Sequence, residues 1–473
     1  MGPPPFQQPQ GIGIVTRILH LLENCCRSQG HLHQIQAQII LHNLHSNTNV
    51  GYHFISACKF LGLLNYPFLL YTINTPKPHT FICNQLIRAF SHSHAHRFSI
   101  SIYSQMHKNS VSPNNYTFPF ILKSLSALKS FKQGKSVHAQ IVKLGHLTDI
   151  YVQNSLLSLY ASCGEMALCR YVFDEMSIRD VVSWTTIITG YRESGKSGDA
   201  LFVFEQMLSV GVEPNRVTMV NALSACASSG ALNVGVWIHE FMKRRAWKLD
   251  VILGTSLIDM YGMNGRMEDG LKVFQTMEEK NVLTWNALIK GLALAKNGHE
   301  AVWWFCRMEE ERAEPDEVTL IGVLCACVHS GLVQKGRDIF SSLLGGKYGF
   351  APGVKHYACM VDLFSRSGYL EDAIRIIKEM PFEATRTIWG SFLSGCRAHG
   401  NLDLSELAAW KLVQLAPESP VYYVVLSNLY AEMGKWDHVE KIRRLMKEME
   451  LNKDLGSSSV ELEHQEDVLK LTA

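Results

Sequence analysis

The sequence lacks an excess of charge of either sign. Among its 473 residues, 45 Lys and Arg stand against 43 Asp and Glu, so the formal net charge is +2, and charged residues make up only 19% of the chain. Without a strong basic field there is no long-range attraction for polyanions, so any nucleic-acid partner would have to be held by local contacts. Hydrophobic residues reach 47%, which excludes disorder for most of the chain.

Motifs for metal binding, redox chemistry and membrane insertion are also missing. No CxxC occurs among the 12 cysteines and no secretory signal precedes them, so we expect buried structural thiols in a reducing compartment. The longest apolar stretch, residues 60–73, is interrupted by Asn65 and Pro67 and is shorter than the roughly 20 residues of a membrane-spanning helix. We therefore expect no membrane partner, no metal and no cofactor.

What the sequence has instead is internal repetition. Three ladders share a period of 101 residues: Met106, Met207 and Met308; Pro113, Pro214 and Pro315; Gly134, Gly235 and Gly336. The period divides into units of 35, 35 and 31 residues, first at 80–114, 115–149 and 150–180, and again at 181–215, 216–250 and 251–281. A third round starts at residue 282, passes 316, and ends near 353 and 385, and two degenerate units, 14–47 and 48–79, precede the first round.

Each unit is predicted to form two helices. In the unit 181–215, apolar residues recur at helical spacing from Trp184 to Tyr191, glycines at 195 and 198 break the pattern, and a second periodic run leads to Met207. A hairpin of this size cannot bury both faces alone, so successive hairpins must stack. The predicted fold class is all-α, an α-solenoid (superhelix) of stacked helix-turn-helix repeats.

Small polar residues recur at the fifth and the last position of several units. The fifth residues are Asn84, Asn154, Thr185, Thr255 and Asn286, and the last residues are Asn114, Asp180, Asn215, Asn281 and Asp316. Asn offers a donor and an acceptor, Thr a hydroxyl and Asp an acceptor, and recognition of a base edge requires such groups. The alternative for the last residue is that Asn or Asp after Pro caps the next helix.

The second residue of the same units is apolar or aromatic. These residues are Phe81, Tyr151, Val182, Ile252 and Leu283. Ordinary core packing is one explanation for the aliphatic members. Arrays of helical hairpins also serve as peptide-binding scaffolds, and periodicity alone does not separate them from RNA-binding arrays. The paired polar residues at the fifth and last positions favour RNA.

The repeats resemble those of plant pentatricopeptide repeat proteins of the PLS subfamily. The resemblance covers residues 15 to 462 and rests on segments such as VVSWTTIITGYRESG, SLIDMYGMNGRMEDGLKVFQTM and EVTLIGVLCACVHSGLVQKG. After them, RTIWGSFLSGCRAHGNLDLSELAAWKLVQLAPESP and VYYVVLSNLYAEMGKWDHVEKIRRLMKEM resemble the two E-type extension motifs of that family. The expected parts are a segment 1–14 with weak targeting features, degenerate repeats 15–79, repeats 80–385, E-type motifs 386–451 and a tail 452–473 without a DYW deaminase domain.

The resemblance implies a base code. In that family the fifth and last residues specify one base per unit, and the second residue wedges between bases. Carried over, Asn84 with Asn114 implies C, Asn154 with Asp180 implies U, Thr185 with Asn215 implies A, Thr255 with Asn281 implies A, and Asn286 with Asp316 implies U. The implied 5′ to 3′ pattern is C n U A n A U, where n marks units whose fifth residues are Pro119 and Val220.

The resemblance also implies a role in C-to-U RNA editing. A nucleobase deaminase needs an H-x-E segment followed by P-C-x-x-C. Here His464 and Glu466 have no cysteine pair after them, so we expect a non-enzymatic factor that binds single-stranded organellar RNA. The partners implied are a DYW-type deaminase acting in trans and multiple organellar RNA editing factor proteins. The expected compartment is the mitochondrion, with the chloroplast as the alternative, and splicing, stability or translation of organellar RNA is the alternative role.

Overall fold

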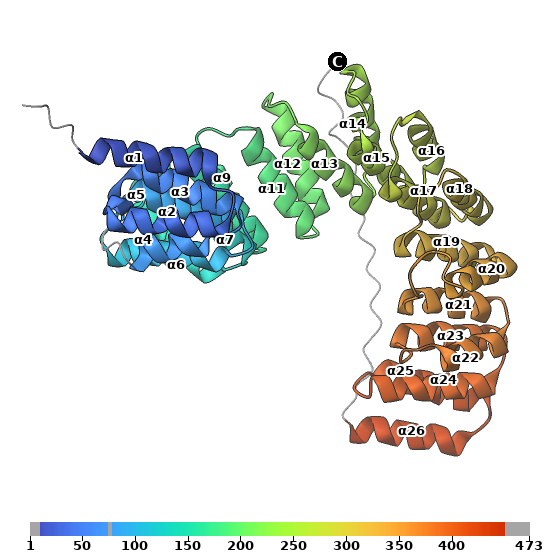
Figure 1. Cartoon of the computed structure of the whole chain (residues 1–473). Helices are drawn as coiled ribbons and strands as arrows, with labels where there is room; N and C mark the ends of the chain where they lie inside the picture. Colours follow the sequence, from blue (N-terminus) through green and yellow to red (C-terminus); the bar gives the residue numbers. More distant parts are fainter. Residues whose placement is uncertain (1–9, 74–77, 450–473) are drawn as a thin grey trace, which may run out of the picture. The chain divides into compact units, whose positions relative to one another are not determined.

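The computed structural model describes residues 10–73 and 78–449, which form helices and no strand (Figure 1). The chain divides into two compact units, residues 1–248 and 249–473. The helices of the first unit are α1 (Gln10–His20), the π-helix η1 (Leu21–Cys25), α2 (Gln29–Leu41), the 3-10 helix η2 (Leu44–Ser46), α3 (Thr48–Phe60), α4 (Asn65–Ile73), α5 (Thr80–Ser91), α6 (His96–Lys108), α7 (Phe118–Ala127), α8 (Phe131–Lys143), α9 (Ile150–Ser162), α10 (Met166–Glu175), α11 (Val181–Glu193), α12 (Ser197–Ser209), α13 (Arg216–Ser229) and α14 (Leu232–Arg244).

The second unit continues with the same alternation of helices. Its members are α15 (Val251–Met263), α16 (Met267–Thr276), α17 (Val282–Leu294), α18 (Gly298–Glu310), α19 (Glu317–Ser330), α20 (Val333–Leu344), α21 (Val354–Arg366), α22 (Leu370–Glu379), α23 (Arg386–Ala398), α24 (Leu402–Leu415), α25 (Pro420–Glu432) and α26 (Trp436–Glu448). The predicted E-type motifs therefore form two further helical hairpins, α23 with α24 and α25 with α26.

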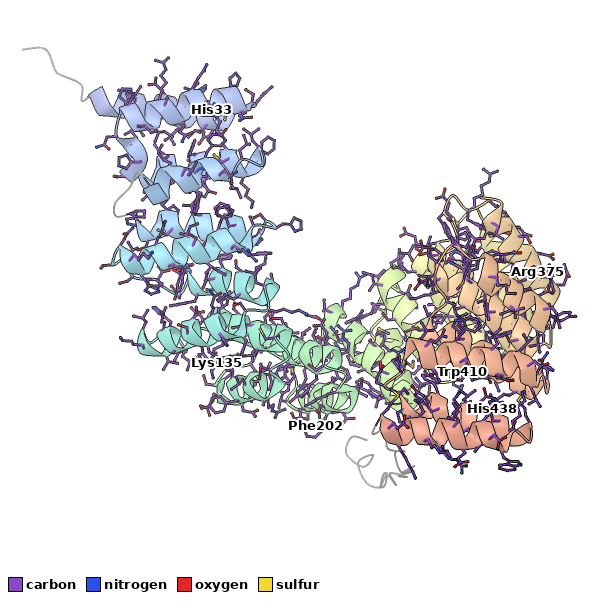
Figure 2. The ribbon with its side chains drawn as sticks, turned by 90° about the horizontal axis from the view of Figure 1, so that it is seen from below. His33, Lys135, Phe202, Arg375, Trp410 and His438 are labelled. Carbon is purple, nitrogen blue, oxygen red and sulfur yellow. The ribbon has the colours of Figure 1, made fainter. Side chains whose placement is uncertain are left out.

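Successive hairpins stack through their first helices. In the first unit α3, α5, α7, α9, α11 and α13 contact one another in order, and in the second unit α15, α17, α19, α21 and α23 do so. From α5 onward, each of these odd-numbered helices also packs against the second helix of its own hairpin. The even-numbered helices carry exposed side chains such as Lys135 in α8 and Phe202 in α12 (Figure 2). The predicted all-α solenoid architecture is confirmed within each unit.

Glycine ends the first helix of most hairpins, as the repeat pattern predicts. Gly195 follows α11 with a φ of +74°, a left-handed conformation that favours glycine, and the equivalent Gly164, Gly230, Gly265, Gly331 and Gly368 also have positive φ. The prediction that Gly198 also breaks the helical pattern is wrong. Gly198 lies in the first turn of α12, where the helix has already started at Ser197. The loop between α11 and α12 is therefore shorter than the spacing of the two glycines indicates.

The methionines and glycines that recur every 101 residues occupy tightly packed positions. Met106, Met207 and Met308 are buried in the core. At Gly134, an added Cβ would lie 2.5 Å from the Leu159 Cδ2 of the next odd-numbered helix, and at Gly336 the corresponding distance to Leu363 Cδ2 is 2.4 Å. Two aromatic pairs also repeat with this period: Phe173 with Trp184 and Phe274 with Trp285 each meet edge to face with centroids 4.8 Å apart.

Two neighbouring first helices of the second unit, α21 and α23, approach each other closely at Gly395. A Cβ built there would lie 2.5 Å from the Ser365 Cβ and 2.6 Å from the Ser365 carbonyl oxygen, so α23 and α21 meet almost backbone to backbone. Gly390, one and a half turns earlier in α23, has no such neighbour within 4 Å. Only one of the two glycines is therefore required by packing.

The cysteines are mostly, but not all, buried. Among the described ones six are buried, four are half-buried and Cys306 is exposed, so the expectation of buried thiols is wrong for Cys306 and holds only in part for the half-buried ones. Cys325 in α19 and Cys359 in α21 lie with their sulfur atoms 3.5 Å apart. No helix in residues 10–73 and 78–449 is long and apolar enough to cross a membrane.

Candidate nucleic-acid interface

The predicted site residues gather at the amino-terminal ends of the odd-numbered helices. The fifth residues lie in the first two turns of α5, α9, α11, α15 and α17. Asp180, Asn215, Asn281 and Asp316 are the N-cap residues of α11, α13, α17 and α19, and Asn114 precedes the turn that leads into α7. Each last residue thus lies beside the helix that follows its own unit.

In three units the structure brings the fifth and the last residue into direct contact. The Nδ2 atom of Asn84 donates to Asn114 Oδ1 at 3.0 Å. Asn154 Nδ2 donates to Asp180 Oδ1 at 3.2 Å. In the second unit the bond from Asn286 Nδ2 to Asp316 Oδ1 measures 3.0 Å. The sequence predicted these pairs, and each forms one polar cluster, in which the side chains of Asn84 and Asn286 are mostly buried, with 8% exposed in each case.

In the two units whose fifth residue is threonine, a third residue links the fifth residue to the last one. Thr185 Oγ1 lies 2.6 Å from Thr218 Oγ1, and Thr218 Oγ1 donates to Asn215 Oδ1 at 3.0 Å. Thr255 Oγ1 lies 2.9 Å from Thr284 Oγ1, whose hydroxyl contacts Asn281 Oδ1 at 3.1 Å. The predicted partners in these units are therefore linked by a hydroxyl from the next helix.

Helix capping, the alternative for the last residues, also occurs. Asp180 Oδ1 accepts the Ser183 N–H at 2.8 Å, and Asp316 Oδ1 accepts the Thr319 N–H at 2.8 Å. Asn215 and Asn281 accept from the equivalent backbone N–H groups at 2.9 and 3.1 Å. A cap uses Oδ1 for the backbone. What remains for other partners is Oδ2 in Asp, an acceptor, and Nδ2 in Asn, a donor.

The two capping carboxyl groups are held in their ionised form. Burial opposes ionisation of Asp180, but hydrogen bonds from the backbone N–H of Ser183 and from the Asn154 amide outweigh it, and the pKa lies below its ordinary value. Asp316 has a pKa lowered in the same way, because donors from Thr319 and Asn286 outweigh its burial. Both side chains are thus acceptors at neutral pH.

The second residues are exposed. Tyr151 is 74% exposed and Leu283 62% exposed, and Phe81, Val182 and Ile252 are also among the exposed large hydrophobic residues. Core packing as an explanation for the aliphatic members is therefore wrong. Each of these side chains lies three residues before the fifth residue of its own unit, in the same helix, so an exposed apolar side chain stands about one turn from each polar pair.

Sequence reasoning missed one set of residues, the third residue of the following unit. These residues are Thr117, Ser183, Thr218, Thr284 and Thr319, and all have no exposed surface. In the three Asn units their hydroxyls donate to the fifth residue: Thr117 to Asn84 Oδ1 at 2.7 Å, Ser183 to Asn154 Oδ1 at 2.7 Å and Thr319 to Asn286 Oδ1 at 2.6 Å. Alignment of the units would have revealed hydroxyl residues at this position.

Other candidate features stay apart from these clusters. His138 Nδ1 lies 2.7 Å from the Tyr160 hydroxyl oxygen, and burial lowers its pKa, as in an ordinary packed histidine. His464 and Glu466 lie outside the described residues. Within the ranges that the structure describes, no three His, Cys, Asp or Glu side chains form a metal-binding group.

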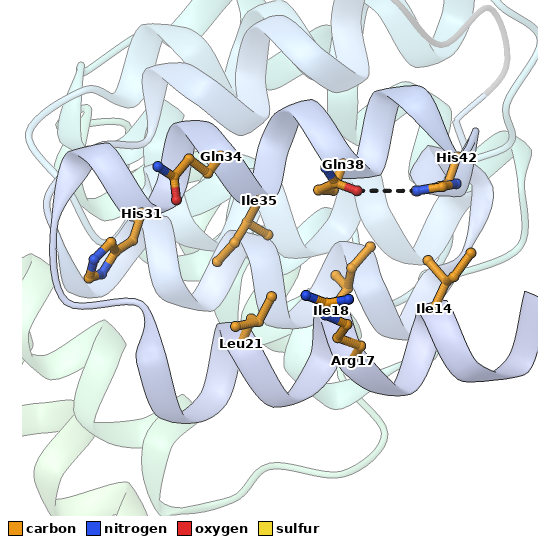
Figure 3. A pocket seen from close by; sticks show the side chains of 9 residues that line it. All are labelled: Ile14, Arg17, Ile18, Leu21, His31, Gln34, Ile35, Gln38 and His42. Atoms are coloured by element: carbon orange, nitrogen blue, oxygen red, sulfur yellow. Dashed lines mark hydrogen bonds between the residues drawn. The ribbon is translucent and has the colours of Figure 1, made fainter.

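A hollow of about 570 Å³ lies between α1 and α2 in the degenerate amino-terminal repeats (Figure 3). Apolar residues such as Ile18 and Ile35 line it together with Arg17 and His31. His42 closes one end, where its Nε2 lies 3.2 Å from Gln38 Oε1. None of the predicted base-recognition residues lines this hollow.

Comparison with protein families finds matches along the chain. A model described as PPR repeat matches residues 154–181, 255–282, 283–312 and 356–383, the PPR repeat family model matches 179–228, and the pentatricopeptide repeat domain model matches 77–126. The E motif model matches residues 399–461.

Relatives occur in Arabidopsis thaliana. One pentatricopeptide repeat-containing protein is 36% identical over 455 residues, which cover 89% of this chain and 85% of the relative. Another, named as mitochondrial, is 33% identical over 92% of this chain and 67% of its own length. A third, named as chloroplastic, is 34% identical over 93% of this chain and 73% of its own length.

The fold is similar to that of a solved repeat protein. The crystal structure of the pentatricopeptide repeat protein PPR10 in complex with an 18-nt psaJ RNA element matches with a TM-score of 0.70 and 14% identity, over 92% of this chain and 66% of that chain. At this identity the likeness concerns the fold. The repeat matches, the E motif and the relatives show that the chain belongs to the pentatricopeptide repeat family, in its PLS subfamily with an E-type extension.

Proposed function

We propose that the chain binds single-stranded RNA sequence-specifically, one base per polar cluster. The observation that carries the proposal is the recurrence of five clusters at equivalent helix ends, each made of a fifth residue, a last residue whose Oδ1 accepts a backbone N–H, and an exposed apolar second residue. Modular recognition of one base per helical repeat by two or three side chains is an established mechanism for RNA. Exposed apolar side chains such as Tyr151 supply stacking surfaces, which suits a chain with little net charge.

Helix capping gives the proposed code a physical basis. Because the cap uses Oδ1, Asp180 and Asp316 keep Oδ2 as an acceptor, which matches the N3–H donor of uracil. Asn114 does not cap a helix, but its Oδ1 accepts the backbone N–H of Tyr116 at 3.1 Å, so its Nδ2 remains a donor, which matches the N3 acceptor of cytosine. The proposed target, with the units taken in chain order, is C n U A n A U.

We further propose that the RNA is organellar and that recognition serves C-to-U editing. The E-type helices α23 to α26 would recruit a DYW-type deaminase in trans, with multiple organellar RNA editing factor proteins as further partners. Support comes from the E motif match and from relatives named as mitochondrial or chloroplastic. We place the protein in the mitochondrion, with the chloroplast as the alternative compartment, and assign no catalytic residue to the chain.

Binding to short RNA tests the first part of the proposal. The chain should prefer an oligomer containing C n U A n A U over a scrambled oligomer of the same composition. The double variant Thr185→Asn with Asn215→Asp should move the preference of that unit from A toward U. Asp at position 215 can still cap α13, so the start of that helix should be unchanged. Equal affinity for the matched and scrambled oligomers would reject base recognition.

Organellar transcripts test the second part. Sequencing of mitochondrial and chloroplast transcripts from a plant that lacks the protein should show the loss of editing at one or a few cytidines that follow the recognised sequence. An unchanged editing profile together with altered splicing or transcript abundance would replace editing with one of those roles.

A further inference from the structure

The third residues of the units follow a rule that the proposed base code does not contain. Wherever the fifth residue of a unit between residues 80 and 385 is Asn or Thr, the third residue of the next unit carries a hydroxyl: Asn84 with Thr117, Asn154 with Ser183, Thr185 with Thr218, Thr255 with Thr284 and Asn286 with Thr319. Wherever the fifth residue is apolar, the hydroxyl is absent: Pro119 with Val152, Val220 with Leu253, Ile321 with His356 and Ala358 with Ile388. The two positions therefore vary together within one chain.

Helix initiation does not explain this rule. Ser183 and Thr319 return a hydrogen bond to the cap, because their hydroxyl oxygens accept the backbone N–H of Asp180 at 3.3 Å and of Asp316 at 3.1 Å. However, α9 and α15 start normally with Val152 and Leu253 at the same position. Asp149 still accepts the Val152 N–H at 3.2 Å, and Asp250 accepts the Leu253 N–H at 2.9 Å. A hydroxyl is thus not needed to start these helices.

The hydroxyl instead determines how the fifth residue is oriented. An Asn amide can be turned over, which exchanges its donor and its acceptor. In the unit 282–316 the Thr319 hydroxyl donates to Asn286 Oδ1 at 2.6 Å, so Nδ2 is turned to the Asp316 carboxylate at 3.0 Å. The opposite orientation would place the amide oxygen against a carboxylate oxygen that already accepts a backbone N–H. Asn154, between Ser183 and Asp180, is held in the same orientation.

We propose that Thr117, Ser183, Thr218, Thr284 and Thr319 are positioning residues that fix the base-recognising orientation of the preceding fifth residue and so determine specificity without contacting RNA. The proposal rests on the proposed RNA recognition. Full burial of all five side chains keeps them from contacting a base themselves and protects their bonds from competition by water. In the unit 181–215, the Thr218 hydroxyl donates to Asn215 Oδ1 at 3.0 Å and its oxygen accepts from the Thr185 hydroxyl, 2.6 Å away, which fixes Thr185.

The experiment measures base discrimination at one position. Thr319→Val removes the hydroxyl and keeps the branched shape. Competition binding uses four oligomers that carry U, C, A or G opposite the unit 282–316. We expect the preference for U over C to fall by about 5- to 10-fold there, with discrimination at the other positions unchanged. Thr319→Ser should retain the wild-type preference because it keeps the donor.

A second variant and a control complete the design. Ser183→Ala should relax discrimination at the unit 150–180 and keeps the proposal testable if Thr319→Val does not fold, which helical circular dichroism reports. Val152→Thr is the matched control, since it adds a hydroxyl after Pro119, a fifth residue without a side-chain amide, and should leave every preference unchanged. Equal loss of affinity for all four bases in Thr319→Val, or unchanged discrimination, would overturn the positioning role alone. A wild-type chain without any base preference would overturn the proposed function as well.

Discussion

The contact between α21 and α23 predicts opposite effects for the same substitution at two glycines of one helix. Gly390→Ala adds a methyl group where no neighbour lies within 4 Å, whereas Gly395→Ala places it 2.5 Å from Ser365 Cβ and 2.6 Å from the Ser365 carbonyl oxygen. Carbon atoms in contact normally lie about 3.5–4.0 Å apart, so α23 would have to move by about 1 Å. Because a backbone carbonyl cannot rotate away, the strain falls on the helix contact itself.

The expected magnitudes follow from two opposing effects. Replacing Gly by Ala within a helix stabilises it by about 1 kcal/mol. Overfilling a packed contact costs typically about 1–3 kcal/mol. Gly390→Ala should therefore raise the free energy of unfolding by about 1 kcal/mol, and Gly395→Ala should lower it by up to about 2 kcal/mol. For a unit of about 200 residues, the resulting gap of about 1–3 kcal/mol corresponds to a difference in Tm of about 2–12 °C between the variants.

Thermal unfolding followed by far-UV circular dichroism measures the gap directly. Stacked repeats can unfold in parts, so hydrogen exchange of peptides from α21 and α23 should locate the effect, with faster exchange in Gly395→Ala only. Equal Tm values for the two variants, or a more stable Gly395→Ala, would refute the close contact of these helices as the reason for glycine at position 395.

Three further outcomes are expected. Tyr151→Ala should weaken RNA binding by about 5- to 100-fold in fluorescence anisotropy, through loss of stacking, without lowering Tm because the side chain is 74% exposed; unchanged affinity would reject its role. Asp180 and Asp316 have lowered native pKa values, so the stability they contribute is present above the ordinary carboxyl pKa and is lost as pH falls through the native values. In thermal melts recorded at a series of pH values, the Tm of the double variant Asp180→Asn with Asp316→Asn should therefore fall less than the wild-type Tm between about pH 5 and 2. An equal fall in Tm would contradict the stabilising role of the two ionised carboxyl groups. Treatment with oxidised glutathione should form a disulfide between Cys325 and Cys359, because their sulfur atoms lie 3.5 Å apart and the hydrogen bond from Cys359 lowers the pKa of Cys325. Peptide mapping that finds other disulfides first would contradict this.

The hairpin architecture could be predicted from sequence because its determinants are local. Gly195 ends α11, and Met207 lies in the buried face of α12, so residues within one unit specify each hairpin. The error at Gly198 has a local reason too, since a glycine at the start of a helix is tolerated and need not mark a break. The residues alone left the exposure of Tyr151 and Leu283 open, because an apolar residue in the first turn of a helix can face either the core or solvent, and only the wedging role implied by the family resemblance pointed to solvent.

The hydroxyl of the third residue escaped prediction because it acts across the boundary between units. Asn154 and Ser183 belong to different units and are 29 residues apart, so dividing the chain into repeats separates two side chains that form one bond. Sequence alone also did not decide whether the last residue of a unit caps a helix or recognises a base. Capping and base recognition are alternatives for Asp180 when the sequence is considered alone, but one carboxyl group has two oxygen atoms, and the structure uses Oδ1 for the cap.

The capping role of the last residue also has a consequence for how such a chain changes over generations. Asn and Asp cap a helix about equally well, so exchanging Asn215 or Asn281 for Asp leaves the start of the next helix nearly as stable as before. Their codons differ by a single nucleotide. Under the proposed code, one point mutation thus redirects a unit to another base at little cost to folding, and an array of such units can acquire new targets one base at a time.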